Sequence, residues 1–169
     1  MSISDIFDEE FDGVDLSPVG DYVGTVTKAV IRTRDVTFKK TGEVRHVVAA
    51  SCVVALEECL TGKKDDLVMS DINPVFVDVE LDRRTTQAAM DLLTTVEKIV
   101  GAKNLPDDLV RPAIRSLRTL KTDDAATEAA WNPVLALLVG KKVTVGITEN
   151  AKATDPKYRY EAGGISPVL

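Results

Sequence analysis

Five stretches of the chain carry apolar residues in patterns that are typical of β-strands. In the stretch Val75 to Leu81, four aliphatic residues alternate with Phe76, Asp78 and Glu80, which is the period of two of a half-buried strand. In the stretch Val44 to Leu56 only the beginning has a polar side, so we expect this strand to be covered on both faces further along. The predicted strands are Tyr22 to Arg34, Val44 to Leu56, Val75 to Leu81, Lys142 to Thr148 and Lys157 to Glu161.

Between the third and fourth of these strands, apolar residues recur at helical spacing. The first helix is predicted over Thr86 to Val100, with Gly101 at the position of a C-cap. A second helical stretch covers about Pro106 to Leu120, and its early acids suit the positive end of a helix. Asn132-Pro133 has the pattern of an N-cap followed by proline at the first helical position, which predicts a short helix through Val139.

Five strands with helices between the third and the fourth is the chain order of an OB-fold, which commonly holds oligonucleotides or oligosaccharides on strands 2 and 3 and the adjacent loops. We therefore expect a mainly β, α+β fold: a five-stranded OB-like antiparallel β-barrel with a helical insert. With 169 residues the chain is long enough for one domain. The expected division is an acidic N-terminal tail over 1–20 and an OB-like domain over 21–169, with the insert at about 85–139.

The net charge of −6 is concentrated at one end of the chain. Residues 1–21 contain seven acids and no Lys or Arg, whereas the remainder has 20 acids and 21 bases. The body of the protein is therefore close to neutral, and its acidity does not argue against nucleic acid as a ligand. Acidic segments of this kind are usually solvated or serve as interaction tails.

The sequence contains no recognisable catalytic or metal-binding arrangement. His46 is the only histidine and lies on the apolar side of a predicted strand, where a structural role is expected. The pairs Asp65-Asp66, Asp107-Asp108 and Asp123-Asp124 are better explained by helix capping and solvation than by Mg²⁺ binding. Asp78 and Glu80 share one face of a predicted strand, as the metal-binding carboxylates of some nucleases do. No lysine lies two residues after Glu80 to complete that arrangement. We expect no enzymatic activity, cofactor or metal.

Apolar stretches are too short to cross a bilayer, and the N-terminus is acidic where a signal peptide is basic. We therefore expect a protein without membrane contact, located in the cytoplasm (that of the host cell if the protein is encoded by a phage). Homo-oligomerisation is left open by the sequence.

Candidate binding residues cluster in two predicted connections. The segment between the first two strands sets one aromatic ring among three bases, and the connection before the last strand adds two lysines and two tyrosines. Cations that follow phosphates and rings that stack on bases are what sequence-independent binding of a single strand requires. The candidate nucleic-acid-binding residues are Arg34, Phe38, Lys39, Lys40, Arg45, Lys152, Lys157, Tyr158 and Tyr160. The alternative to a binding role is a structural one: Lys39 and Lys40 would form a solvated hairpin tip, and the tyrosines would close the barrel.

Several short segments resemble small phage-encoded single-stranded DNA-binding proteins. They are Gly20-Asp21-Tyr22-Val23, Thr41-Gly42, the helix Thr86 to Val100 with Gly101, the run Leu138 to Val145, Tyr158-Arg159-Tyr160 and the opening Ile6 to Asp12. The resemblance covers most of the chain, although the chain ends without the acidic C-terminal tail of many single-strand binders and has only 5% aromatic residues. It implies an OB-fold accessory protein that coats exposed single strands of DNA during phage DNA replication or recombination.

The sequence thus favours a non-catalytic, largely sequence-independent single-stranded DNA-binding protein. Its acidic tail is a candidate docking site for replication or recombination proteins, and it could compete with DNA for the basic surface. The main alternative is a phage structural or adaptor protein that uses the same barrel for protein contacts, and a metal nuclease ranks third.

Overall fold

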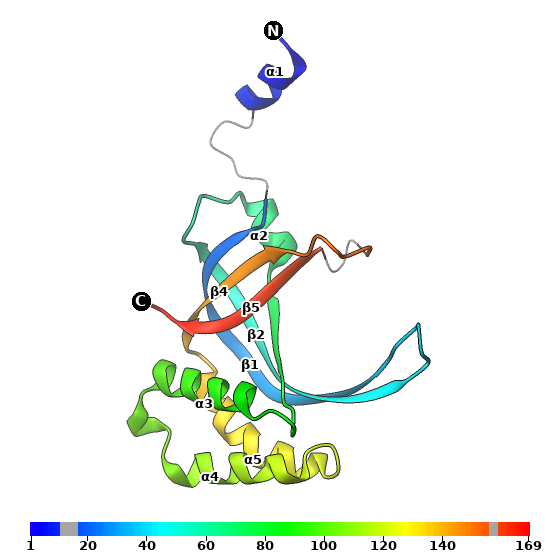
Figure 1. Cartoon of the computed structure of the whole chain (residues 1–169). Helices are drawn as coiled ribbons and strands as arrows, with labels where there is room; N and C mark the ends of the chain where they lie inside the picture. The colour runs from blue at the N-terminus through cyan, green and yellow to red at the C-terminus, as the bar shows by residue number, and fades with distance from the viewer. Residues whose placement is uncertain (11–16, 156–158) are drawn as a thin grey trace.

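The computed structural model describes residues 1–10, 17–155 and 159–169. Its strands are β1 Gly20–Thr37, β2 Val44–Cys59, β3 Val75–Glu80, β4 Lys142–Glu149 and β5 Tyr160–Pro167. Its helices are α1 Ile3–Glu10, α2 Asp66–Ile72, α3 Gln87–Val100, α4 Asp107–Ser116 and α5 Asp124–Leu135, with short 3-10 turns at Ala102–Asn104, Leu117–Thr119 and Ala136–Leu138. The strands form one antiparallel sheet in the order β3-β2-β1-β4-β5, and α3, α4 and α5 lie between β3 and β4 along the chain (Figure 1). The expected α+β class with helices between the third and fourth strands is confirmed.

The expected closed barrel is not found, because the sheet has two free edges. β3 and β5 are the edge strands, and no ladder joins them within the described residues. The strong curvature of the sheet nevertheless brings β3 and β5 close to each other. Side chains from both strands, among them Phe76 and Tyr160, line the gap that main-chain hydrogen bonds would fill in a closed barrel.

The last strand differs most from its prediction. It was expected over Lys157 to Glu161, but β5 runs from Tyr160 to Pro167 and passes through Gly163 and Gly164; residues 157 and 158 lie outside the described part of the chain. Glycine usually weakens a strand because it has no side chain to pack. Here β4 supplies the pairing, and Ile165, opposite Val145, is buried against the core.

A long hairpin extends beyond the rest of the sheet. β4 pairs with β1 only as far as Thr25, and β3 pairs with β2 only over Ala49 to Val54, so residues 32–47 form a two-stranded ribbon, here called the hairpin arm (Figure 1). At its tip the Phe38 amide donates to the Glu43 carbonyl at 2.9 Å, and the Gly42 amide donates to the Phe38 carbonyl at 2.8 Å. Gly42 has φ of 69°, a conformation in which glycine has no steric penalty.

The core lies between the inner face of the sheet and the helices. α3 places its apolar stripe there. Gly101 ends the helix with φ of 89°, and its backbone amide donates a hydrogen bond to the Glu97 carbonyl; a C-cap at Gly101 was predicted from the sequence. The largest fully buried side chains include Tyr22 of β1 and Trp131 of α5. Burial of this apolar surface is the main force that holds helices and sheet together. The cluster is built around Tyr22, Val26, Val48, Val54, Leu92, Val96, Trp131, Val134, Leu135, Val143 and Val145.

The prediction of a helix beginning at Asn132-Pro133 is wrong. α5 begins nine residues earlier, where the Asp123 carboxylate caps it by accepting from the Ala126 amide at 3.0 Å, and Pro133 lies inside the helix. The Asn132 side chain instead accepts a hydrogen bond from the Ile31 amide of β1 at 2.8 Å. An asparagine that resembled a cap in sequence therefore attaches the helix to the sheet.

Two helices were not predicted. α2 begins after Asp65, whose carboxylate accepts from the Val68 amide at 2.8 Å, in a segment expected to be a loop. The capping interpretation of the acid pairs is thus confirmed at Asp65 and Asp123. α1 lies in the acidic tail, and none of its residues is buried. No helix in the described ranges is both long and apolar enough to cross a membrane.

Candidate nucleic-acid interface

The outer face of β1, β2 and β3 presents cations beside a recessed row of small residues. The register places Ala49 between Arg32 and Glu80, and Ser51 lies between Val30 and Asp78. Ala49 and Ser51 are buried although they point away from the core, because longer side chains stand on either side of them. The Ser51 hydroxyl has no hydrogen-bond partner among the described residues.

A cleft of about 960 Å³ opens between the two edge strands, next to this face. The Phe76 ring is 58% exposed there, whereas Tyr160 is half-buried and packs against the core. The Arg159 guanidinium lies 5.3 Å from the centroid of the Tyr160 ring. The lining includes one guanidinium and three carboxylates, so its charge is mixed. The charged and aromatic lining residues are Arg34, Asp71, Phe76, Asp78, Tyr160 and Glu161.

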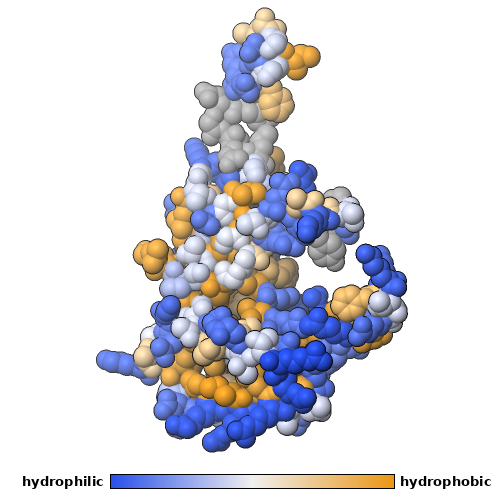
Figure 2. All heavy atoms as spheres, viewed as in Figure 1, coloured by the Kyte–Doolittle hydropathy of each residue, from blue (hydrophilic) through white to orange (hydrophobic). Residues whose placement is uncertain are grey.

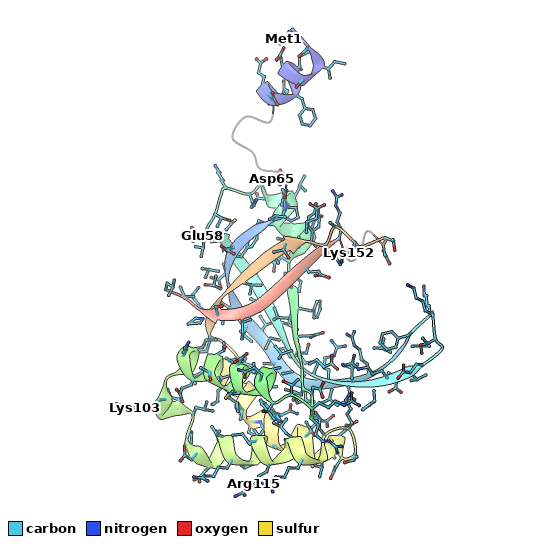
Figure 3. The ribbon with its side chains drawn as sticks, in the orientation of Figure 1. Met1, Glu58, Asp65, Lys103, Arg115 and Lys152 are labelled. Atoms are coloured by element: carbon cyan, nitrogen blue, oxygen red, sulfur yellow. The ribbon has the colours of Figure 1, made fainter. Side chains whose placement is uncertain are left out.

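The tip of the hairpin arm adds a second aromatic ring with two lysines. Phe38 is 43% exposed and forms a shallow pocket with Lys39, Lys40, Thr41 and Glu43. Figure 2 shows open space between this tip and the described part of the loop that follows β4. We call this space the hollow. Lys152 is exposed in that loop, on the opposite side of the hollow from the arm (Figure 3). Together with the cleft and the outer face, the hollow makes up the candidate interface.

The candidate residues fare differently in the structure. Arg34, Phe38, Lys39, Lys40 and Tyr160 lie around the cleft and the arm, and Lys152 lies across the hollow. Arg45 lies at the base of the arm, but its guanidinium forms an ion pair with Glu80, so its charge is already compensated. Lys157 and Tyr158 lie outside the described residues.

Phe76 and Arg32 were missed by the sequence interpretation, although the sequence held a signal for Phe76. This ring stands at a polar position of a strand that alternates apolar and polar residues, where an aromatic is unusual. Arg32 also had a sequence signal, because it lies two positions before Arg34 in the same predicted strand and therefore on the same face; the register adds that it lies opposite Ala49.

His46 connects the arm to the helical insert. Its Nδ1 lies 2.7 Å from Asp35 Oδ1 in the arm, and its Nε2 lies 2.7 Å from Asp124 Oδ2 at the beginning of α5. The hydrogen bond with Asp35, and then that with Asp124, raises the pKa of His46 above its ordinary value of 6.5. The imidazolium form can donate to both carboxylates at once. The arm is therefore held at its base by a pH-sensitive bridge.

The described residues include no group of three or more His, Cys, Asp or Glu side chains that could hold a metal ion. The groups that line the candidate interface are cations, exposed rings and carboxylates. Models of known protein families give no match to this chain, and curated proteins give none either.

Proposed function

We propose that this protein binds single-stranded DNA without catalysing a reaction on it and largely without regard to sequence. The strands would act as an OB-like barrel whose seam between β3 and β5 is open. The observation that carries the proposal is the gathering of exposed rings and cations from distant parts of the chain around one cleft and one arm, with Phe76 and Arg34 at the cleft and Phe38 at the tip.

In this proposal the cations follow the phosphates and the rings stack on bases. Arg32 and Arg34 lie along β1, and Lys39 and Lys40 extend the same strip to the tip of the arm. Phosphate contacts supply affinity by releasing counterions, and stacking on Phe76 or Phe38 is tolerant of sequence because every base has a π-face. The site therefore needs no hydrogen bonds to base edges.

The acids of the cleft favour a single strand over a duplex. Asp78, Asp71 and Glu161 lie near Arg34 and repel a polyanion. A duplex carries one charge per about 1.7 Å of helix axis and cannot expose its bases to a ring, so it meets the repulsion without the gain from stacking. The resemblance to phage proteins adds replication or recombination as the setting.

The mixed charge of the cleft also favours a second candidate, a structural or adaptor protein of a phage that uses this surface for protein contacts. Surfaces that bind proteins commonly carry both signs of charge around exposed apolar groups. The two candidate functions predict different results with single-stranded DNA. A single-strand binder has affinity that depends on salt, whereas the structural or adaptor protein has none.

Fluorescence anisotropy with labelled single-stranded DNA, duplex and RNA of equal length tests the proposal. Affinity for single-stranded DNA should fall steeply as salt rises, and the double change Lys39→Gln and Lys40→Gln should reduce the slope of log affinity against log salt by up to about 1.4, which corresponds to two phosphates. The matched control is Lys98→Gln with Lys103→Gln, which removes two exposed charges from the helical insert.

The control pair should leave the slope close to that of the wild type. Equal affinity for duplex, or no binding to any oligonucleotide at low salt, would falsify the single-strand assignment and favour the structural alternative. Equal slopes for the arm variant and the control pair would place the phosphate contacts elsewhere.

A further inference from the structure

The helical insert carries an apolar groove that the proposed function does not use. It lies between α3 and α4, has a volume of about 540 Å³ and exposes Met90 (52%) and Ile114 (50%). Figure 2 shows apolar residues between these two helices, with hydrophilic residues on both sides. Exposed apolar surfaces with a polar rim commonly mark sites of protein contact. The apolar lining residues are Ala89, Met90, Leu93, Leu105, Val110, Ile114 and Leu117.

The rim of this groove is predominantly basic. Arg83 and Arg118 line it, against a single acid, Glu97. The segment from Arg83 to Lys121 contains eight Lys or Arg residues and four Asp or Glu residues, a net charge of +4. A suitable occupant is therefore an acidic amphipathic helix, since such a helix inserts apolar side chains into a groove and leaves its charged side facing the rim.

The same chain provides a helix with these properties. In α1, Ile3, Ile6 and Phe7 share one side at helical spacing and are 86%, 48% and 53% exposed. Residues 1–10 also carry four acids and no base. The apolar side of α1 matches the groove in character, and its charge of −4 is complementary to that of the insert.

Hydrogen bonds within its own first turn stabilise α1 as a helix. The Asp5 amide donates to Ser2 Oγ at 3.1 Å, and the Ser2 amide donates to Asp5 Oδ2 at 3.0 Å, which is the reciprocal arrangement of a capping box. The hydrogen bonds from Ser2 lower the pKa of the Asp5 carboxyl and keep it ionised. A preformed helix loses less conformational entropy on binding than a disordered segment does.

We propose that α1 of one copy of this chain docks into the α3–α4 groove of a neighbouring copy. Figure 1 places α1 at the end of the molecule opposite to the helical insert. Pro18 is buried and its carbonyl accepts a hydrogen bond from the Tyr22 hydroxyl, so the connection that can extend runs only from Glu10 to Ser17 and reaches at most about 25 Å. Docking within one chain would need that connection stretched along the outside of the sheet, whereas docking onto a neighbour would not.

A contact between α1 and the groove joins two different surfaces, so each copy retains one free helix and one free groove. Such contacts produce a closed dimer when two copies exchange their helices, and rings or open chains of subunits when they do not. An open row of subunits suits a protein that coats single-stranded DNA, which is the function proposed above. Each bound copy would then favour the binding of the next copy. The contact itself requires no DNA and can be tested in its absence.

Sedimentation velocity over a range of concentrations at low salt tests the proposal with the full-length chain. The helix variant carries Ile3→Asp and Ile6→Asp, and the groove variant carries Met90→Glu and Ile114→Glu. The wild type should form larger species as its concentration rises, and each variant alone should remain monomeric. Their mixture should stop at dimers, because only one intact helix and one intact groove are available in each pair.

The matched control is Leu67→Glu, which places an acid on an apolar side chain that is 76% exposed in α2. It should assemble as the wild type does. A labelled peptide of residues 1–11 should bind the helix variant, and the same changes at Ile3 and Ile6 in the peptide should reduce its affinity at least about tenfold.

The remaining outcomes would overturn the proposal. If the wild type is monomeric at every concentration while the helix variant binds the peptide, α1 docks within its own chain. If the helix and groove variants both assemble like the wild type, other surfaces form the oligomer. If neither assembly nor peptide binding occurs, the groove has a different occupant.

Discussion

The cleft between β3 and β5 and the groove between α3 and α4 are both open and partly apolar, but they differ in what they expose. The cleft presents flat aromatic rings among charges of both signs, whereas the groove presents aliphatic side chains with two arginines at its rim. Rings suit the faces of bases, and a trough of aliphatic side chains suits a helix. In our two proposals, the sheet and the insert therefore bind two partners of different chemistry.

The two surfaces also depend on different parts of the fold. The walls of the cleft come from edge strands that are already attached to the sheet by ladders on one side. The walls of the groove are two helices whose positions depend on packing against α5 and the sheet. Changes in the helical packing should therefore separate the two proposed binding activities.

The largest effect is expected from Trp131→Ala. Trp131 is fully buried, and its Nε1 donates to Ser116 Oγ of α4 at 3.0 Å. Loss of the ring should lower the free energy of unfolding by roughly 3–5 kcal/mol, measured by urea denaturation followed by circular dichroism. Binding of the α1 peptide should be lost at lower urea concentrations than binding of single-stranded DNA.

Trp131→Phe provides the control, since it keeps an aromatic ring but removes the hydrogen bond. It should cost about 1 kcal/mol in stability, and both binding activities should remain. Simultaneous loss of the two activities in Trp131→Ala at every urea concentration would mean that the sheet and the insert unfold as one unit.

A smaller effect, confined to the cleft, is expected from Phe76→Ala. The ring is 58% exposed, so its removal should change the free energy of unfolding little. If it stacks on a base, affinity for single-stranded DNA should fall by about 1–3 kcal/mol in anisotropy titrations. Affinity for the α1 peptide should not change.

Phe76→Trp is the matched variant, because a larger ring can still stack. It should retain or increase affinity for single-stranded DNA. Equal loss in the alanine and tryptophan variants would show that the position is sensitive to any change of shape, and the stacking role would be rejected.

The smallest effect is expected at the bridge between the two regions. The pKa of His46 is raised in the folded protein, so the protonated form stabilises the fold below the ordinary pKa of 6.5, and this contribution is lost as pH rises through the raised pKa. The thermal midpoint of the wild type should exceed that of His46→Gln at acidic pH, and the difference should shrink at alkaline pH. A difference that grows with pH would contradict the role assigned to Asp35 and Asp124.

Local patterns predicted the elements whose burial follows a simple period. The alternation around Phe76 gave β3, and the spacing before Gly101 gave α3, because both elements bury one side against the core. The pattern failed where a polar residue had a distant partner. Asn132 resembled a helix cap, but its partner is an amide of β1 that lies 101 residues away in sequence.

The candidate interface shows the same limit. Arg34 and the segment Phe38 to Lys40 could be selected from their composition and position between two strands. The pairing of Arg45 with Glu80 could not, because the two residues are 35 positions apart and meet only through the β2–β3 register. Phe76 carried a local signal, but its place in a cleft depends on how closely β5 approaches β3.

By itself the sequence determined the order of the five strands with helices between the third and the fourth, the concentration of acids at the N-terminus and the lysine-bearing hairpin, since each depends on residues that are close along the chain. Only the tertiary structure decided that the sheet stays open, that the cleft carries both signs of charge, and that α3 and α4 leave a groove between them. These features depend on the curvature of the sheet and on how the helices pack against it. Such packing is set by many long-range contacts at once, and no short segment encodes it.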